Sequence, residues 1–259
     1  MKFDYDWQYN VLNIYNTNRT GSLERYYNFI KENHQKMDGD ICEVGVYQGR
    51  SLLATALLLK EIGSDKKVYG FDSFSGFPSY HSQYDSLDHF DTMFKDGVIS
   101  SDHLNQVKLN LKYRELFTSK DHGSSVLSSS GDFSDTSVEQ LKQKIEFLKL
   151  DNIEIIEGSY ASTMIKKKSN SNYKFCSVLM DCDLYDSYKI ALPFVWERME
   201  TDAYMFLDEY FSLKFPGARV AIDEFFNEDN KPISYKTNTE WSHVGMDFER
   251  WYARKWKQL

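Results

Sequence analysis

The chain has 259 residues, 41% of them hydrophobic, and a formal net charge of -8. This length suits one α/β domain with additions, which we take as residues 1–259. The acidic balance opposes non-specific binding to nucleic acid, and no apolar run reaches the roughly 20 residues that cross a bilayer.

Short apolar runs alternate with amphipathic, helix-length stretches along most of the chain. An N-terminal helical segment is expected over 1–38. The expected strands are 40–46, 67–71, 153–156, 175–179 and 203–207, with final strands in 233–256. The expected helices are 22–35, 51–62, 136–148, 186–199 and 216–227. This alternation predicts an α/β fold with a doubly wound, mostly parallel, Rossmann-like sheet.

An insertion of about 73–135 follows the second expected strand. It is polar and aromatic, with helices expected near 91–94 and 104–117, and a Ser-rich stretch at 123–137 that we expect to be mobile. A long insertion at this place predicts a lid over a substrate site, and a loop without function is the alternative.

Glycines at the end of the first expected strand suggest a ligand-binding turn. The segment Glu43–Gly49 has the spacing E-x-G-x-x-x-G, and Asp72 ends the second strand 23 residues after Gly49. Glycines let a backbone approach a ligand, and an acid at this distance binds ribose hydroxyls in Rossmann-type folds. Structural turn glycines and a turn cap are the alternatives. Together the two features predict a nucleoside-containing cofactor.

Four acidic residues follow the next two parallel strands. Asp181 and Asp183 come after 175–179, and Asp208 and Glu209 come after 203–207. A right-handed crossover brings the carboxyl ends of both strands to one edge, so up to four carboxylates converge there. Such a cluster requires protons or a cation, and oxygen ligands favour Mg²⁺. Salt bridges and caps are the alternative, and Asp183 in particular is a candidate cap for the helix that follows.

Two further features suggest the compartment. The first residues lack the basic and apolar regions of a secretion signal. The three cysteines, Cys42, Cys176 and Cys182, lie in or beside expected core strands without metal-ligand spacing. We expect reduced thiols in a cytoplasmic protein that has neither a nucleic-acid nor a membrane partner.

Four segments together resemble a known family. Glu43–Gly49 is similar to the first motif of class I S-adenosylmethionine (SAM) methyltransferases. The other three segments resemble motifs of macrocin-type (TylF-like) sugar O-methyltransferases: Phe71–Pro78 resembles D-S-F-x-G-L-P, Asp181–Ser187 resembles D-G-D-L-Y-E-S, and Phe206–Tyr210 resembles I-D-D-Y. A P-G-x-R pattern also occurs at 216–219. The resemblance runs from about residue 21 to 227.

The resemblance implies a SAM-dependent O-methyltransferase that uses Mg²⁺ and methylates a sugar-containing small molecule, and it suggests a homo-oligomer. The implied metal ligands are Asp181, Asp208 and Glu209, and Asp181 is also the implied general base. The implied SAM-binding residues are Glu43, Gly45, Tyr47, Gly49, Asp72, Ser73, Ser159, Tyr160 and Asp181.

Some features leave room for other interpretations. Cys182 replaces the glycine of the family's motif, and Glu209 replaces an aspartate. His81, in the insertion, is a second candidate base, with a surface histidine as the plainer alternative. A metal-dependent glycosyltransferase of the D-x-D type and a non-catalytic partner protein with a SAM-type fold are the rival functions. The sequence does not identify the acceptor.

Overall fold

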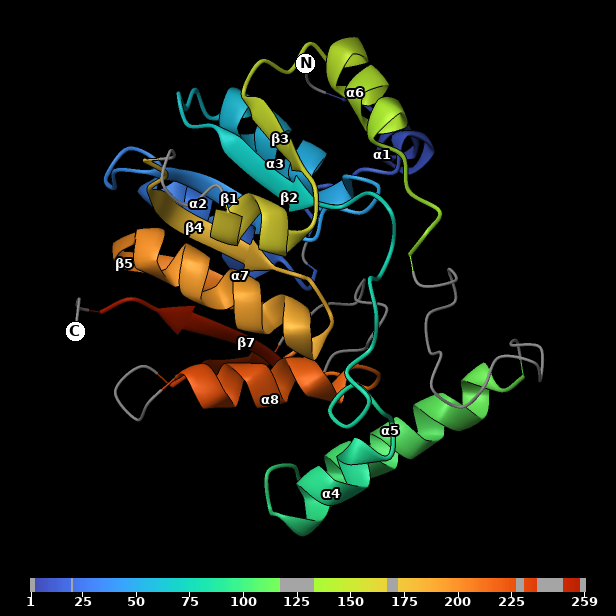
Figure 1. Cartoon of the computed structure of the whole chain (residues 1–259). Helices are drawn as coiled ribbons and strands as arrows, with labels where there is room; N and C mark the ends of the chain where they lie inside the picture. The colour runs from blue at the N-terminus through green and yellow to red at the C-terminus, as the bar shows by residue number, and fades with distance from the viewer. Residues whose placement is uncertain are drawn as a thin grey trace.

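Seven strands form one sheet in the computed structural model, which describes residues 3–19, 21–116, 133–166, 172–226, 231–236 and 249–256 (Figure 1). The strand order is β3-β2-β1-β4-β5-β7-β6. The strands are β1 (Asp40–Val44), β2 (Val68–Asp72), β3 (Ile153–Glu157), β4 (Phe175–Met180), β5 (Met199–Leu207), β6 (Ile233–Lys236) and β7 (Glu249–Arg254). The first five pair in parallel, and β7 pairs antiparallel with both β5 and β6.

Helices cover both faces of the sheet, and α4 and α5 lie beyond its edge (Figure 1). The helices are α1 (Asp6–Leu12), α2 (Glu24–Asn33), α3 (Arg50–Glu61), α4 (His89–Lys95), α5 (Ser101–Arg114), α6 (Val138–Phe147), α7 (Tyr185–Arg198), α8 (Pro216–Phe225) and the π-helix η1 (Ala161–Lys166). The alternation of side chains along β1 separates two cores: Ile41 packs with α2 and α3, whereas Cys42 and Val44 pack with α7 and α8. The predicted doubly wound, mostly parallel sheet is confirmed.

The predicted elements are present, with shifted boundaries. Strand β5 starts at Met199, directly after α7 and four residues earlier than expected. Helix α5 starts at Ser101, because the Ser100 side chain accepts a hydrogen bond from the backbone N–H of His103 and caps the helix. Its expected end at 117 lies outside the described residues, as does most of the Ser-rich stretch 123–137.

The insertion docks at the carboxyl edge of the sheet. The chain leaves β2 and reaches α4 and α5 beside α8 (Figure 1). His103 of α5 donates from Nε2 to the carbonyl of Ser212 at 2.7 Å, and Asn110 donates to the carbonyl of Leu213 at 3.2 Å. These bonds hold α5 against the loop that follows Asp208 and Glu209, so the insertion forms a wall of the region where the acids lie.

The three cysteines, Cys42, Cys176 and Cys182, are free and buried. Among the described residues, no helix has both the length and the apolar character needed to cross a membrane.

Candidate active site

The turn after β1 lies directly against the end of β4. Gly45 has φ +89°, and a Cβ added there would lie 1.6 Å from the backbone carbonyl oxygen of Asp181. Its N–H donates to the carbonyl of Phe71 at 3.0 Å, which ties the turn to β2 as well. Glycine is therefore required at this position, where the order of the strands reverses and α/β proteins bind ligands.

Asp72 holds this turn in place. Its Oδ2 accepts hydrogen bonds from the backbone N–H groups of Val46 at 2.7 Å and Tyr47 at 2.8 Å, and its Oδ1 accepts from Phe74 N–H at 2.7 Å. The carboxylate is half-buried and also lines the adjacent cavity. Asp72 thus acts as a turn cap in this structure and remains accessible to a ligand.

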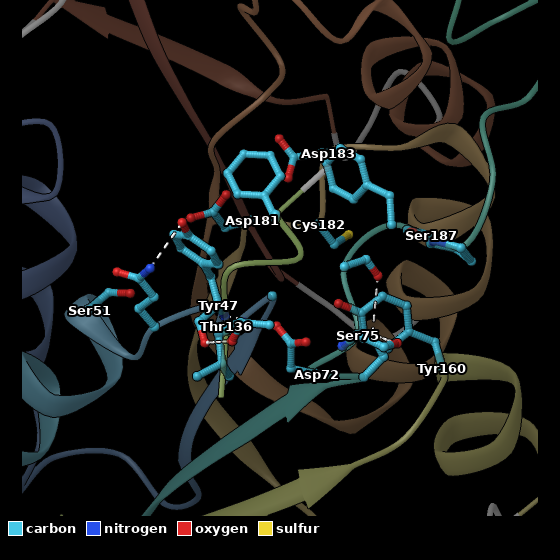
Figure 2. Close-up of a pocket in the computed structure, with 18 of the residues that line it drawn as sticks. Tyr47, Ser51, Asp72, Ser75, Thr136, Tyr160, Asp181, Cys182, Asp183 and Ser187 are labelled. Atoms are coloured by element: carbon cyan, nitrogen blue, oxygen red, sulfur yellow. Dashed lines mark hydrogen bonds between the residues drawn. The ribbon is translucent and has the colours of Figure 1, made fainter. Parts of the chain in front are cut away.

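A cavity of about 470 Å³ opens beside the turn. Figure 2 shows Asp181 and Asp183 toward one end of it and Asp72 and Tyr160 toward the other. Of the residues predicted to bind SAM, seven line this cavity: Gly45, Tyr47, Asp72, Ser73, Ser159, Tyr160 and Asp181. The other two predicted residues, Glu43 and Gly49, do not line it.

Glu43 and Gly49 lie behind the cavity wall. Glu43 is fully buried; its Oε1 accepts a 2.6 Å hydrogen bond from Ser51, and its Oε2 has no partner among the described residues. Burial, reinforced by the negative charges of Asp181 and Asp72, raises its pKa well above the usual value. Gly49, at φ +78°, precedes α3 and allows close packing of Leu141.

The pairing of β4 with β5 brings the predicted acids together. Met180 is in register with Leu207, so the next residues, Asp181 and Asp208, lie side by side. One carboxylate oxygen from each of Asp181, Asp208 and Glu209 lies within 4.8 Å of the others. The convergence expected from the crossover is therefore present in the structure.

The cluster favours protonation when no cation is bound. Burial, followed by the charge of Asp208, raises the pKa of Asp181 to about 7. Burial also raises the pKa of Asp183 and Glu209 well above the ordinary values. Arg250 neutralises only part of the negative charge, through an Nη1–Oδ1 contact of 3.4 Å with Asp208.

The buried carboxylate of Glu209 is fixed by its neighbours. Its Oε2 accepts a hydrogen bond from the Tyr188 hydroxyl at 2.5 Å and a longer one from the Asp183 N–H at 3.4 Å. Helix α7 has Leu184 as its N-cap, with no side-chain cap, so the alternative in which Asp183 caps this helix is wrong. The N–H of Tyr185 instead donates to Asp85 of the insertion at 2.9 Å.

A second cavity, of about 670 Å³, adjoins the first on the side of the acids. All four acids line it, together with residues of α5 and of the loop after β5. Five residues line both cavities: Tyr15, Ser51, Phe133, Asp181 and Asp183. Two adjoining cavities that share acidic residues could hold two substrates that react with each other beside these acids.

The structure also settles where Cys182 and His81 lie. Cys182 is 5% exposed and packs in the core cluster on the α7 side of the sheet, so its side chain fits where the family has glycine. His81 stacks on Tyr84, with ring centroids 4.7 Å apart, and lines neither cavity. The structure therefore does not bring this second candidate base to the acids.

Several residues of the site were missed in the sequence. Thr136 donates to the carbonyl of Tyr47 at 2.5 Å, and Asp135 accepts from the Tyr47 hydroxyl at 2.6 Å. Lys214 and Arg250 line the second cavity. None of these residues belongs to a motif with a distinctive spacing, so no local signal identified them.

The comparisons with known proteins agree with this site and fold. Residues 5–164, which make up 160 of the 259, match the model of the family described as macrocin O-methyltransferase (TylF). The chain is therefore a SAM-dependent O-methyltransferase by class. It belongs to the macrocin O-methyltransferase family, which confirms the resemblance. The acids at 181, 208 and 209 lie beyond the matched residues.

Solved structures share the fold at low sequence identity. The O-methyltransferase NovP superposes with a TM-score of 0.61 and 16% identity, over 91% of this chain and 79% of that chain. The calicheamicin methyltransferase CalS11 gives a TM-score of 0.59 and 17% identity, over 96% and 80%. No curated protein matches the sequence significantly. Because the matched family consists of methyltransferases, the glycosyltransferase alternative is not favoured.

Proposed function

We propose that this enzyme transfers a methyl group from SAM to a hydroxyl of a sugar-containing small molecule, with Mg²⁺ bound by Asp181, Asp208 and Glu209. The observation that carries the proposal is the convergence of these three carboxylates within 4.8 Å at the border of two cavities. The family membership supports methyl transfer. CalS11, which has a similar fold, is a TDP-rhamnose 3'-O-methyltransferase, and this supports a sugar acceptor.

The first cavity is the proposed SAM site. Its polar residues suit an adenosyl group: the accessible Asp72 carboxylate can accept hydrogen bonds from ribose hydroxyls, and Tyr160 offers an aromatic wall for the adenine. Ser159 lies beside that wall. The turn at Gly45 brings the backbone close to the place where the sulfonium would lie.

The donor set fits a hard divalent ion. All three ligands are carboxylates, which Mg²⁺ prefers. Oxygens bound about 2.1 Å from one octahedral ion lie about 3.0 Å apart when adjacent and about 4.2 Å apart when opposite, so the three carboxylates would draw closer together around the ion. Burial, followed by the charge of Asp208, raises the pKa of Asp181 to about 7, and a bound cation would favour its deprotonated form.

Two effects would make the acceptor hydroxyl reactive. A bound divalent ion would stabilise the alkoxide form of the hydroxyl. Asp181 lines both cavities, so its carboxylate would face both the methyl donor and the sugar acceptor. We therefore assign Asp181 the role of the base that accepts the hydroxyl proton. The adjoining cavities would align the oxygen with the methyl group, which contributes to the rate through proximity.

Replacement of Asp72 by Asn is expected to weaken S-adenosylhomocysteine (SAH) binding about tenfold or more, because a charged acceptor for the ribose is lost. The matched control is Glu157→Gln. Glu157 is the register partner of Asp72 on β3 but is exposed and lines neither of the two cavities described above. Calorimetric titration measures both affinities. Equal affinities in the two variants would count against the ribose role.

Magnesium is expected to stabilise the protein more as pH rises. An acid whose pKa is raised by folding holds a proton that the unfolded chain has lost, so for Asp181 the stability falls as pH rises from the ordinary 3.8 to about 7. Mg²⁺ binds the deprotonated cluster, so its thermal shift should be small near about pH 5.5 and large near about pH 8. Asp208→Asn should abolish the shift. A shift that does not depend on pH, or that this variant retains, would place the ion elsewhere.

The function is tested by SAH titration together with a screen of sugar acceptors with methyl-labelled SAM and Mg²⁺. We expect SAH to bind and label to transfer to a sugar hydroxyl. Binding of SAH together with transfer only to acceptors without sugar would overturn the proposed acceptor class, and failure to bind SAH would overturn the donor site.

A further inference from the structure

Besides Arg250, which contacts Asp208, two cationic side chains line the second cavity. Lys214 comes from the loop after β5, and Arg114 comes from the last turn of α5. Neither lines the first cavity, so both lie away from the proposed methyl donor. They belong to segments that the bonds from His103 and Asn110 hold together. The docked insertion thus supplies Arg114, and the loop after β5 supplies Lys214.

Lys214 is attracted by the charges of Asp183, Asp208 and Glu209 but makes no direct salt bridge with them. Within the described part of the chain, its ammonium group has no carboxylate within 4.0 Å and no hydrogen bond. Its backbone N–H donates to the Ser212 hydroxyl at 3.1 Å, and its Nζ lies over the Phe215 ring, 5.7 Å from the centroid. Arg250, by contrast, contacts Asp208 directly. A charge held in a cavity without a salt-bridge partner is costly, and a ligand of opposite sign in direct contact would relieve that cost.

The two cations also repel each other. Burial lowers the pKa of Lys214, and the charge of Arg114 lowers it further. Two like charges that face one space are relieved by an anion between them. Arginine forms paired hydrogen bonds with phosphate and carboxylate, and lysine adds a compact charge. Gln106, Asn110 and Tyr113 of α5 supply further polar groups on the same wall.

We propose that Lys214 and Arg114 bind an anionic group, a phosphate or carboxylate, on the sugar acceptor. The inference rests on the proposed function, because it assigns the second cavity to the acceptor. The methylated hydroxyl lies at the acids, and the anionic group lies against α5 and the loop after β5. The acceptor is then a sugar phosphate, a nucleotide sugar or an acidic sugar, not a neutral glycoside.

The test measures binding of matched sugars to the SAH-loaded protein. The probes are the 1-phosphates and the uronic acids of glucose, galactose and mannose, with the methyl glycosides of the same sugars as neutral counterparts. We expect at least one charged sugar to bind about tenfold or more tightly than its neutral counterpart, as measured by calorimetry. Comparison of the 1-phosphates with the uronic acids distinguishes a phosphate group from a carboxylate group on the acceptor.

Variants separate a direct role from a structural one. Lys214→Met should remove the preference for the charged sugar, and Lys214→Arg should restore it, while SAH affinity stays unchanged in both. Lys112→Met is the matched control, since Lys112 is exposed on α5 and lines neither cavity. An equal affinity for charged and neutral sugars, binding of none of the probes, or a preference that survives Lys214→Met would overturn the proposal. Loss of SAH binding in the wild type would instead contradict the proposed function.

Discussion

Replacement of Asp181 by Asn is expected to lower kcat by roughly 10²–10⁴-fold while SAH still binds. The substitution removes the proposed proton acceptor and a charged metal ligand but keeps the size of the side chain. Its backbone N–H would still donate to the carbonyl of Val44, a bond of 2.9 Å, so the end of β4 should keep its place. Single-turnover transfer from labelled SAM measures the chemical step, and calorimetry measures SAH affinity.

Asp186→Asn is the matched control for this prediction. Asp186 is an exposed aspartate in the first turn of α7, five residues from Asp181, and lines neither cavity. We expect its activity to equal that of the wild type. Turnover by the Asp181 variant within a few-fold of the wild type would remove this carboxylate from the chemistry.

Replacement of Gly45 by Ala is expected to cost roughly 2–5 kcal/mol of unfolding free energy and to abolish SAH binding. The added Cβ would lie 1.6 Å from the carbonyl oxygen of Asp181, a backbone atom that cannot move without displacing the end of β4. The positive φ of +89° adds conformational strain. Urea denaturation measures the first effect, and titration with SAH measures the second.

Gly63→Ala separates the two causes. Gly63 also has a positive φ, +66°, but a Cβ added there meets no atom within 4 Å. This variant should therefore lose about 1 kcal/mol of unfolding free energy, from conformational strain alone, and should bind SAH normally. If both glycine variants lost the same stability, the close approach of the turn to β4 would not be a feature of the folded protein.

Local patterns in the sequence were enough to predict the sheet and the meeting of the acids. The apolar runs before Asp181 and Asp208 bury both strands, and a crossover has one favoured hand, so both carboxylates had to reach the same edge. The glycine at 45 was also visible, because its turn follows a strand and precedes a buried helix. Periodicity and handedness are properties of short segments, so they can be recognised without the structure.

The docking of the insertion was not predictable in the same way. Asp85 accepts from the Tyr185 N–H across 100 residues, and α5 reaches the Ser212 carbonyl through His103. These contacts join segments whose own patterns carry no sign of a partner. The sequence did not identify Lys214 as a cavity residue for the same reason, because the position of Lys214 depends on a loop that α5 covers. Glu43 shows the converse case, because a motif residue expected at the cofactor lies beneath the turn.

The central claim is that one divalent ion binds among Asp181, Asp208 and Glu209 beside the methyl donor. Crystals of the protein with SAH and Mn²⁺, measured at a wavelength where manganese scatters anomalously, test it directly. We predict one anomalous peak bonded to all three carboxylates, with SAH in the neighbouring cavity. SAH bound there without a peak at these residues, or a peak bonded to other residues, would contradict the claim.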